Sequence, residues 1–297
     1  TFYLWDIQKQ KTCKRFDCSQ APISVGISPD RHYVLSWYNS PVPTVEIFPV
    51  DCPQSMRKFT MDSDLLLAEF DKYGNVVAVT EGGVFLYEAT GNEVCSEIAS
   101  VTAAAFYKER NAIVAFISPG TIQLWSVTET KFIPEPKRVL PQSINCIRSM
   151  ASWTHQGDEY VVLQTPSELI YFTLDDVNNI VMRPQQIGFW KVFGAGPNAI
   201  TVSPSAPTAL MTWNVKENKI KYHDVPPDDS VITAFYISGK AMAVADQRNE
   251  IHILDASCTC QQSFFAGYQY WDTGYVCQYS PVAGTEYGLC RKTSNYL

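Results

Sequence analysis

A strand-like segment that recurs about every 40 residues is the strongest constraint on how this chain of 297 residues folds. Each copy is a short run of aromatic, aliphatic and β-branched residues, and the copies begin at residues 3, 45, 84, 122, 169, 210 and 251. One marker side chain from each copy gives the series Trp5, Phe48, Leu86, Leu124, Tyr171, Trp213 and Ile253. A period of about 40 residues is typical of propeller blades that have four strands each.

The intervals between the copies contain further short strand patterns. After residues 45–50, such patterns occupy residues 56–59, 65–70 and 76–80, with turns at residues 71–75 and at Gly82-Gly83. Glycine, asparagine and aspartate suit these turns because they adopt positive φ at low cost. Helical periodicity is hard to find in any apolar run, so the sequence predicts an all-β, WD40-type β-propeller of four-stranded blades. The dipeptide Trp-Asp occurs only at residues 5–6 and 271–272, which indicates degenerate repeats.

Counting the repeats gives six full blades and two partial ones. The chain begins with patterns that correspond to the third and fourth strands of a blade, and it ends with patterns for a first and a second strand. The two halves could pair and close a seven-bladed ring, or the chain could be an excerpt of a longer polypeptide. Because both ends fall within strand patterns and residue 1 is Thr, we expect residues 1–297 to be a single propeller domain cut at both ends.

Charge, cysteine content and hydropathy bear on the class of protein. The chain has 23 basic and 30 acidic residues and a net charge of −7, whereas dedicated nucleic-acid binders usually have the opposite balance. Its nine cysteines include no Cys-x-x-Cys pair, so a zinc ribbon or a redox motif has no support. Scattered free thiols are typical of a reducing compartment, and we expect a cytoplasmic protein. No apolar run approaches the roughly 18 residues of a membrane span.

Residue patterns typical of catalysis are absent from the sequence. The four histidines, His32, His155, His223 and His252, form no His-x-x-x-His pair, and we expect His252 to alternate outward from an apolar strand. There is no Gly-x-Ser-x-Gly nucleophile elbow and no phosphate-binding glycine loop. Carboxylate pairs at residues 62/64, 175/176 and 228/229 fall in polar loops. The sequence therefore predicts a binding scaffold without catalytic residues, metal, cofactor or small-molecule substrate.

The densest basic stretch is the one candidate for a contact site. It consists of Lys9, Lys11, Lys14 and Arg15. Such a stretch can be an ordinary solvated outer face, or it can bind RNA phosphates or an acidic protein partner.

Three segments resemble one family of propellers. They are residues 4–37, which include LWDIQKQKTCKRF and ISVGISPDRHYVLSW, residues 144–162, which include SWTHQGDEYVV, and residues 250–274, EIHILDASCTCQQSFFAGYQYWDTG. In this order they resemble the propeller of subunit b of eukaryotic translation initiation factor 3. The propeller of initiation factor 2A is similar as well, and its best match runs over residues 34–88.

The resemblance implies a nine-bladed ring, of which this chain would be most. It also implies a non-catalytic scaffold of translation initiation in the cytoplasm. The implied partners are the small ribosomal subunit, through its protein and RNA, and subunits a, g and i of initiation factor 3. Two alternatives stay open, namely a propeller like that of initiation factor 2A and a generic WD40 scaffold of another cytosolic complex.

Overall fold

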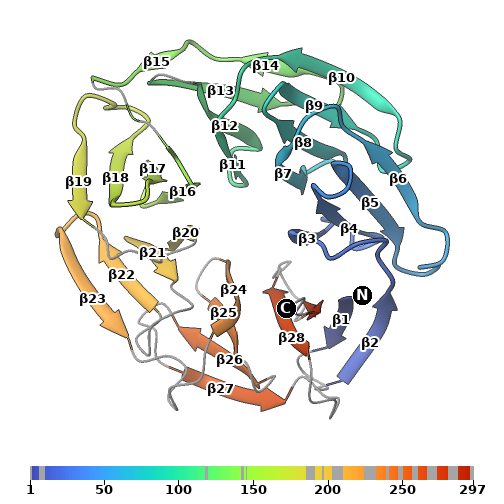
Figure 1. The fold of residues 1–297 in the computed structure, drawn as a ribbon. Coiled ribbons are helices and arrows are strands. Elements are labelled where there is room, and N and C mark those ends of the chain that lie inside the picture. The colour runs from blue at the N-terminus through green and yellow to red at the C-terminus, as the bar shows by residue number, and fades with distance from the viewer. Residues whose placement is uncertain are drawn as a thin grey trace.

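The computed structural model describes residues 2–6, 11–117, 120–141, 144, 146–184, 191–195, 197–202, 210–223, 232–238, 241–246, 250–255, 260–265, 273–279 and 287–294. Within these residues, the strands form seven antiparallel sheets that stand as blades around a ring (Figure 1). No helix that could cross a membrane occurs in this part of the chain.

The first three blades follow one another along the chain. Blade 1 consists of β3 (Ser24–Ile27), β4 (Tyr33–Tyr38), β5 (Thr44–Pro49) and β6 (Arg57–Thr60). Blade 2 consists of β7 (Leu65–Phe70), β8 (Val76–Thr80), β9 (Gly83–Tyr87) and β10 (Glu93–Ile98). Blade 3 consists of β11 (Ala103–Tyr107), β12 (Ala112–Ile117), β13 (Thr121–Val127) and an outer strand split into β14 (Phe132–Pro134) and β15 (Arg138–Val139).

The next three blades repeat the same order of strands. Blade 4 consists of β16 (Ser149–His155), β17 (Asp158–Gln164), β18 (Glu168–Thr173) and β19 (Val181–Pro184). Blade 5 consists of β20 (Lys191–Ala195), β21 (Asn198–Val202), β22 (Leu210–Asn214) and β23 (Lys219–His223). Blade 6 consists of β24 (Ile232–Ser238), β25 (Ala241–Asp246), β26 (Glu250–Asp255) and β27 (Cys260–Phe265).

The closing blade joins the two ends of the chain. Its order is β28 (Thr273–Tyr279), β29 (Tyr287–Ser294), β1 (Phe2–Asp6) and β2 (Lys11–Phe16). Strand β1 pairs with β29, with Leu4 opposite Leu289 and Tyr3 opposite Cys290. The expectation of six full blades and two halves is therefore confirmed. The expectation of a nine-bladed ring is wrong, because the two halves pair with each other in one blade, and β28 of this blade contacts β24 of blade 6 and β3 of blade 1.

The blades are radial, so the first strand of each lies nearest the axis and the fourth lies at the rim (Figure 1). All seven marker residues belong to third strands, from Trp5 in β1 to Ile253 in β26. The period in the sequence thus reports the same position in every blade.

The hydrophobic core lies between neighbouring blades. On β8, Val76 and Ala78 join the cluster shared with blade 1, while Val77 and Val79 join the cluster shared with blade 3. Side chains of a strand alternate between the two sides of its sheet. Both faces of an inner strand are buried in a propeller, which explains why these strands have continuous apolar runs.

Candidate interaction surfaces

Each blade is an antiparallel meander, so its first and third turns lie at the same end of the ring. We name this end the turn face and the opposite end the loop face. On the turn face, Asn111 in the β11–β12 turn has a φ of 53°, a conformation that asparagine tolerates. Its Oδ1 accepts a 2.9 Å hydrogen bond from the Lys72 amide of blade 2, and its Nδ2 donates to the Val127 carbonyl at 2.7 Å. This side chain therefore links two blades.

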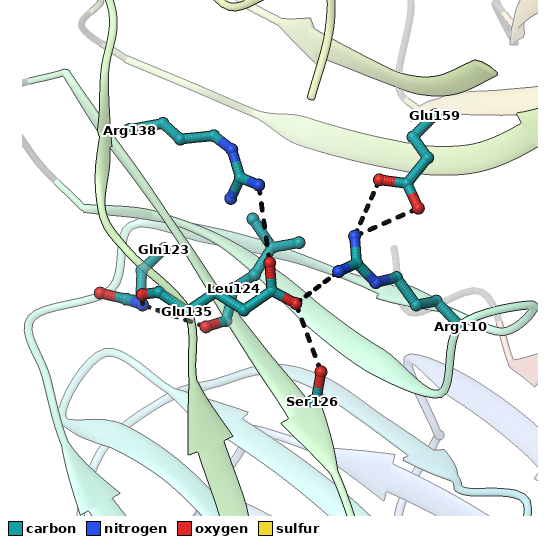
Figure 2. A network of polar contacts seen from close by, with 7 residues as sticks. All are labelled: Arg110, Gln123, Leu124, Ser126, Glu135, Arg138 and Glu159. Atoms are coloured by element: carbon teal, nitrogen blue, oxygen red, sulfur yellow. Dashed lines mark hydrogen bonds and ion pairs between the residues drawn. The ribbon is translucent and has the colours of Figure 1, made fainter. Parts of the chain in front are cut away.

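Arg110, in the same turn, joins blade 3 to blade 4 through two carboxylates (Figure 2). Its Nη1 donates to the Glu159 oxygens at 3.1 and 2.8 Å, and its Nη2 donates to Glu135 Oε1 at 2.7 Å. Glu135 also lies 3.5 Å from Arg138 Nη2 and accepts a 3.3 Å bond from Ser126 Oγ. A guanidinium that makes several hydrogen bonds to carboxylates has a fixed orientation. Arg110 therefore fixes the turn end of blade 3 against β17.

The split outer strand of blade 3 places Glu135 in this network. Residues 135–137 interrupt the strand between β14 and β15, which pair with opposite ends of β13. Gln123 Nε2 donates to the Glu135 carbonyl at 2.5 Å, and the Glu135 amide donates to the Leu124 carbonyl at 2.9 Å. These bonds anchor the interruption and leave the Glu135 carboxylate with Arg110 (Figure 2).

Blades 4 and 5 are linked in a similar way. Lys216 Nζ lies 2.9 Å from Asp158 Oδ2, and its hydrogen bond lowers the pKa of the Asp158 carboxyl. Arg183 Nε donates to Asn218 Oδ1 at 2.5 Å. Lys216, Asp158 and Arg183 are therefore engaged in contacts between these two blades.

Glu46, on β5, is a buried carboxylate that ties the closing blade to blade 1. Its side chain accepts bonds from the Ser19 amide at 3.1 and 3.3 Å, the Tyr38 hydroxyl at 3.2 Å and the Ser36 hydroxyl at 3.4 Å. Ser19 lies between β2 and β3, so these bonds cross from one blade to the next. Buried polar groups need such partners, and a satisfied cluster of them rigidifies the fold.

The predicted basic stretch lies on the outer strand of the closing blade. Lys9 is outside the described residues, and Lys11, Lys14 and Arg15 fall in β2. Lys14 is half-buried, whereas Arg15 is exposed and makes a 2.9 Å ion pair with Asp17. Neighbouring residues of a strand point to opposite faces, so Lys14 and Arg15 do not share one face of the blade.

The other sequence predictions about polar residues have mixed outcomes. His252 is buried in β26, so the expectation that it points outward is wrong, because it shares a face of the strand with the buried Leu254. His223 lies at the end of β23, 2.9 Å from Thr212 Oγ1. Asp175 and Asp176 are exposed in the β18–β19 turn as predicted, while residues 228 and 229 lie outside the described part. Within the described residues, no group of three or more His, Cys, Asp or Glu side chains is placed to hold a metal ion.

Large apolar side chains are exposed on the outer strands of four successive blades. We name this set the rim row, and it consists of Ile98 on β10, Ile133 on β14, Val139 on β15, Met182 on β19, and Ile220 and Tyr222 on β23. Ile98 and Val139 are 84% and 68% exposed. Sequence reasoning missed the row, although the alternation of charged and apolar residues in segments such as KIKYH was visible.

Comparison with known proteins supports the fold alone. No family model matches the sequence, and no curated protein matches it. Among solved structures, the chain is similar to the β-propeller domain of Cps50 (Swd1) of Myceliophteria thermophila, with a TM-score of 0.60 and 12% identity over 95% of this chain and 99% of that one. It is also similar to U3-55K, with a TM-score of 0.63 and 7% identity over 93% and 97% of the two chains. The chain has the fold of a WD40-type β-propeller.

Proposed function

We propose that this propeller is a non-catalytic scaffold that holds protein partners of a larger assembly. The rim row carries this proposal, since it places exposed apolar side chains on four neighbouring outer strands. Exposed apolar surface of this kind is typical of protein interaction sites. The side chains of Arg110, Lys216 and Glu46, which could otherwise serve a reaction, are engaged in contacts between blades.

In its narrower form, the proposal is that the assembly is the cytoplasmic machinery of translation initiation. The sequence segments that resemble subunit b of initiation factor 3 support this form. The partners are then the small ribosomal subunit and subunits a, g and i of the factor, and the basic stretch of Lys9, Lys11, Lys14 and Arg15 is the candidate for contact with RNA. The number of blades speaks against the narrower form. The resemblance implied nine blades, whereas the described residues form seven sheets in a closed ring.

Affinity purification of the tagged protein under gentle conditions tests the general proposal. We expect defined partners to co-purify at fixed stoichiometry and to be lost from the variant I133S/V139S/M182S. The control I23S/V42S changes two exposed apolar side chains of blade 1 outside the rim row and is expected to retain the partners. Both variants should unfold at the wild-type temperature. A protein that elutes alone at every salt concentration would contradict the scaffold proposal.

Sedimentation through a density gradient separates the narrower form from the general one. Migration with small ribosomal subunits at low salt supports the role in translation initiation. Partners that co-purify while the protein sediments apart from ribosomal subunits overturn the narrower form and leave the general one in place.

A further inference from the structure

Blade 2 and the loop before it contain all of the excess negative charge of the chain. Residues 61–98, which comprise this blade and the loop before it, include eight carboxylates and one lysine. Because the whole chain has a net charge of −7, the remaining residues are balanced between acidic and basic side chains. Such a concentration of one sign on a single blade produces a local field that attracts cationic partners.

Most of these carboxylates make no ion pair within the described part of the chain. Among the described residues, Glu69 is the member of the set with an ion pair, at 3.7 Å from Lys108, while Asp71 is buried in its turn. The other six are exposed, and they are Asp62, Asp64, Glu81, Glu88, Glu93 and Glu97. Glu93 and Glu97 lie on β10. Asp64 and Glu81 lie next to each other at the loop-face end of the blade, where the Glu81 amide donates to the Asp64 backbone carbonyl.

Strand β10 is the free edge of blade 2. The order of the sheet is β10-β9-β8-β7, so β10 has a paired neighbour on one side. The Ala99 amide donates to the Gly82 carbonyl at 3.2 Å and therefore points toward β9. The backbone groups of alternate residues point to the same side of an antiparallel strand. The N–H and C=O groups of Ser96 and Ile98 therefore point away from β9, toward the free edge.

The free edge also has the most exposed large apolar side chain of the described residues. Ile98 is 84% exposed and lies opposite Gly83, which offers no side chain to cover it. Natural sheets protect free edges with charged residues. Here both charges on the edge strand, Glu93 and Glu97, are negative, so the edge repels acidic segments and favours basic ones.

We propose that the edge of β10 binds an extended basic segment of a partner protein. The segment adds to blade 2 as a further antiparallel or parallel strand, pairs with the backbone of Ser96 and Ile98, and places lysine or arginine beside Glu93 and Glu97 and an apolar residue on Ile98. Main-chain hydrogen bonds give such strand addition its affinity, and alternate side chains give it specificity. This inference rests on the proposed scaffold function and names one class of partner for it.

Peptide binding to the full chain, followed by fluorescence anisotropy, tests the proposal. The probe is a labelled peptide of about ten residues, in which lysine and valine alternate, a length that spans a typical strand. Its controls are the same peptide with glutamate in place of lysine, and a peptide of equal positive charge with proline in place of valine. We expect the first peptide alone to bind, and its affinity to fall as salt rises from about 0.1 M to about 1 M, since the Debye length shrinks from about 10 Å to about 3 Å.

Two protein variants locate the site. Ser96→Pro removes one outward N–H without removing a bond to β9 and should weaken binding by about tenfold or more, whereas Ser96→Ala should bind like the wild type. The double variant E93K/E97K should weaken binding of the basic peptide and allow the acidic peptide to bind. This variant tests the site independently, should Ser96→Pro fail to fold. Equal binding of the proline-containing peptide, or unchanged binding by all variants, would overturn the proposal.

Sedimentation of the free protein excludes the other occupant of the edge. A dimer that Ser96→Pro dissociates would show that a second copy covers β10, and this too would overturn the proposal. Partners that co-purify with the wild type while no peptide binds would refute the strand-addition site and leave the scaffold function standing.

Discussion

Single polar side chains join neighbouring blades on the turn face, and Arg110 is the clearest example. Substituting Arg110 with alanine removes both carboxylate contacts and leaves Glu135 and Glu159 without their shared cation. We expect a loss of about 1–2 kcal/mol in the free energy of unfolding, because the network is partly buried, whereas an isolated surface pair contributes about 0–1 kcal/mol. Urea denaturation of Arg110→Ala measures this loss. The control Lys219→Ala removes an exposed pair with Glu217 and should change the free energy little; equal effects of the two substitutions would contradict the role of Arg110.

Asp71 gives the stability a predictable dependence on pH. Its Oδ1 accepts bonds from the Tyr73 and Asn75 amides at 2.8 Å, but burial raises the pKa of its carboxyl above the ordinary value of 3.8. A carboxyl whose pKa is higher in the folded protein contributes stability below pH 3.8, and this contribution is lost as the pH rises through the folded-state pKa. Asp71→Asn keeps the Oδ1 acceptor and removes the titration. The free energy of unfolding of the variant minus that of the wild type should therefore rise between about pH 4 and about pH 7, and a constant difference would refute this account.

At the scale of elements, the spacing of β9 and β10 depends on a glycine. A Cβ atom added to Gly83 would clash with the backbone carbonyl oxygen of Glu97, which cannot move without breaking the pairing of the two strands. We expect Gly83→Ala to destabilise the protein by about 1–3 kcal/mol, in the range of other overpacked sites. Thermal unfolding measures the loss. The neighbouring substitution Gly82→Ala is the matched control, since its Cβ would meet the movable Ser63 Oγ at 3.2 Å; a larger loss for Gly82 than for Gly83 would contradict the argument.

The inner strands were predictable from sequence because their chemistry is uniform. The expected segments at residues 65–70 and 76–80 coincide with β7 and β8, since continuous apolar runs bounded by Asp, Asn and Gly turns are typical of buried strands. Outer strands are short and half-exposed, so their patterns are weak. The outer strand of blade 3 is split at Glu135 by two hydrogen bonds of its backbone, one from the Gln123 side chain and one to the Leu124 carbonyl. The residues around Glu135 in the sequence do not predict these bonds.

The candidate site was less predictable for a related physical reason. The basic residues are close together in the sequence, but side chains alternate between the two faces of β2, so Lys14 and Arg15 lie on opposite faces. The rim row comes from the outer strands of four blades, which lie along one rim only when the ring forms. Its members, such as Ile98 and Val139, are indistinguishable from core residues until their strands are placed at the rim.

For the whole molecule, the decisive feature is the pairing of β1 with β29, which closes seven sheets into a ring and sets this chain apart from a fragment of a larger propeller. Tyr3 lies opposite Cys290 in this pairing. Cα atoms of opposed residues in an antiparallel pair are about 4.5–5.5 Å apart, within the range of about 4.4–6.8 Å that a disulfide bridges. Cys277 also lies opposite Cys290, on β28, and would compete for its thiol. In the variant Y3C/C277S, residue 3 should therefore form a disulfide with Cys290 under mild oxidation, detectable as a cross-linked peptide by mass spectrometry and as faster migration on a non-reducing gel. The double variant Y3C/C290S should not form it.

In an open fragment of a larger ring, residues 3 and 290 would belong to different blades, and Y3C/C277S would stay uncross-linked at protein concentrations low enough to prevent dimers. A cross-link within one chain thus requires the ring to close between its own first and last strands, and a closed ring covers both faces of inner strands such as β8 and β12, although their repeats conform weakly to the WD40 pattern.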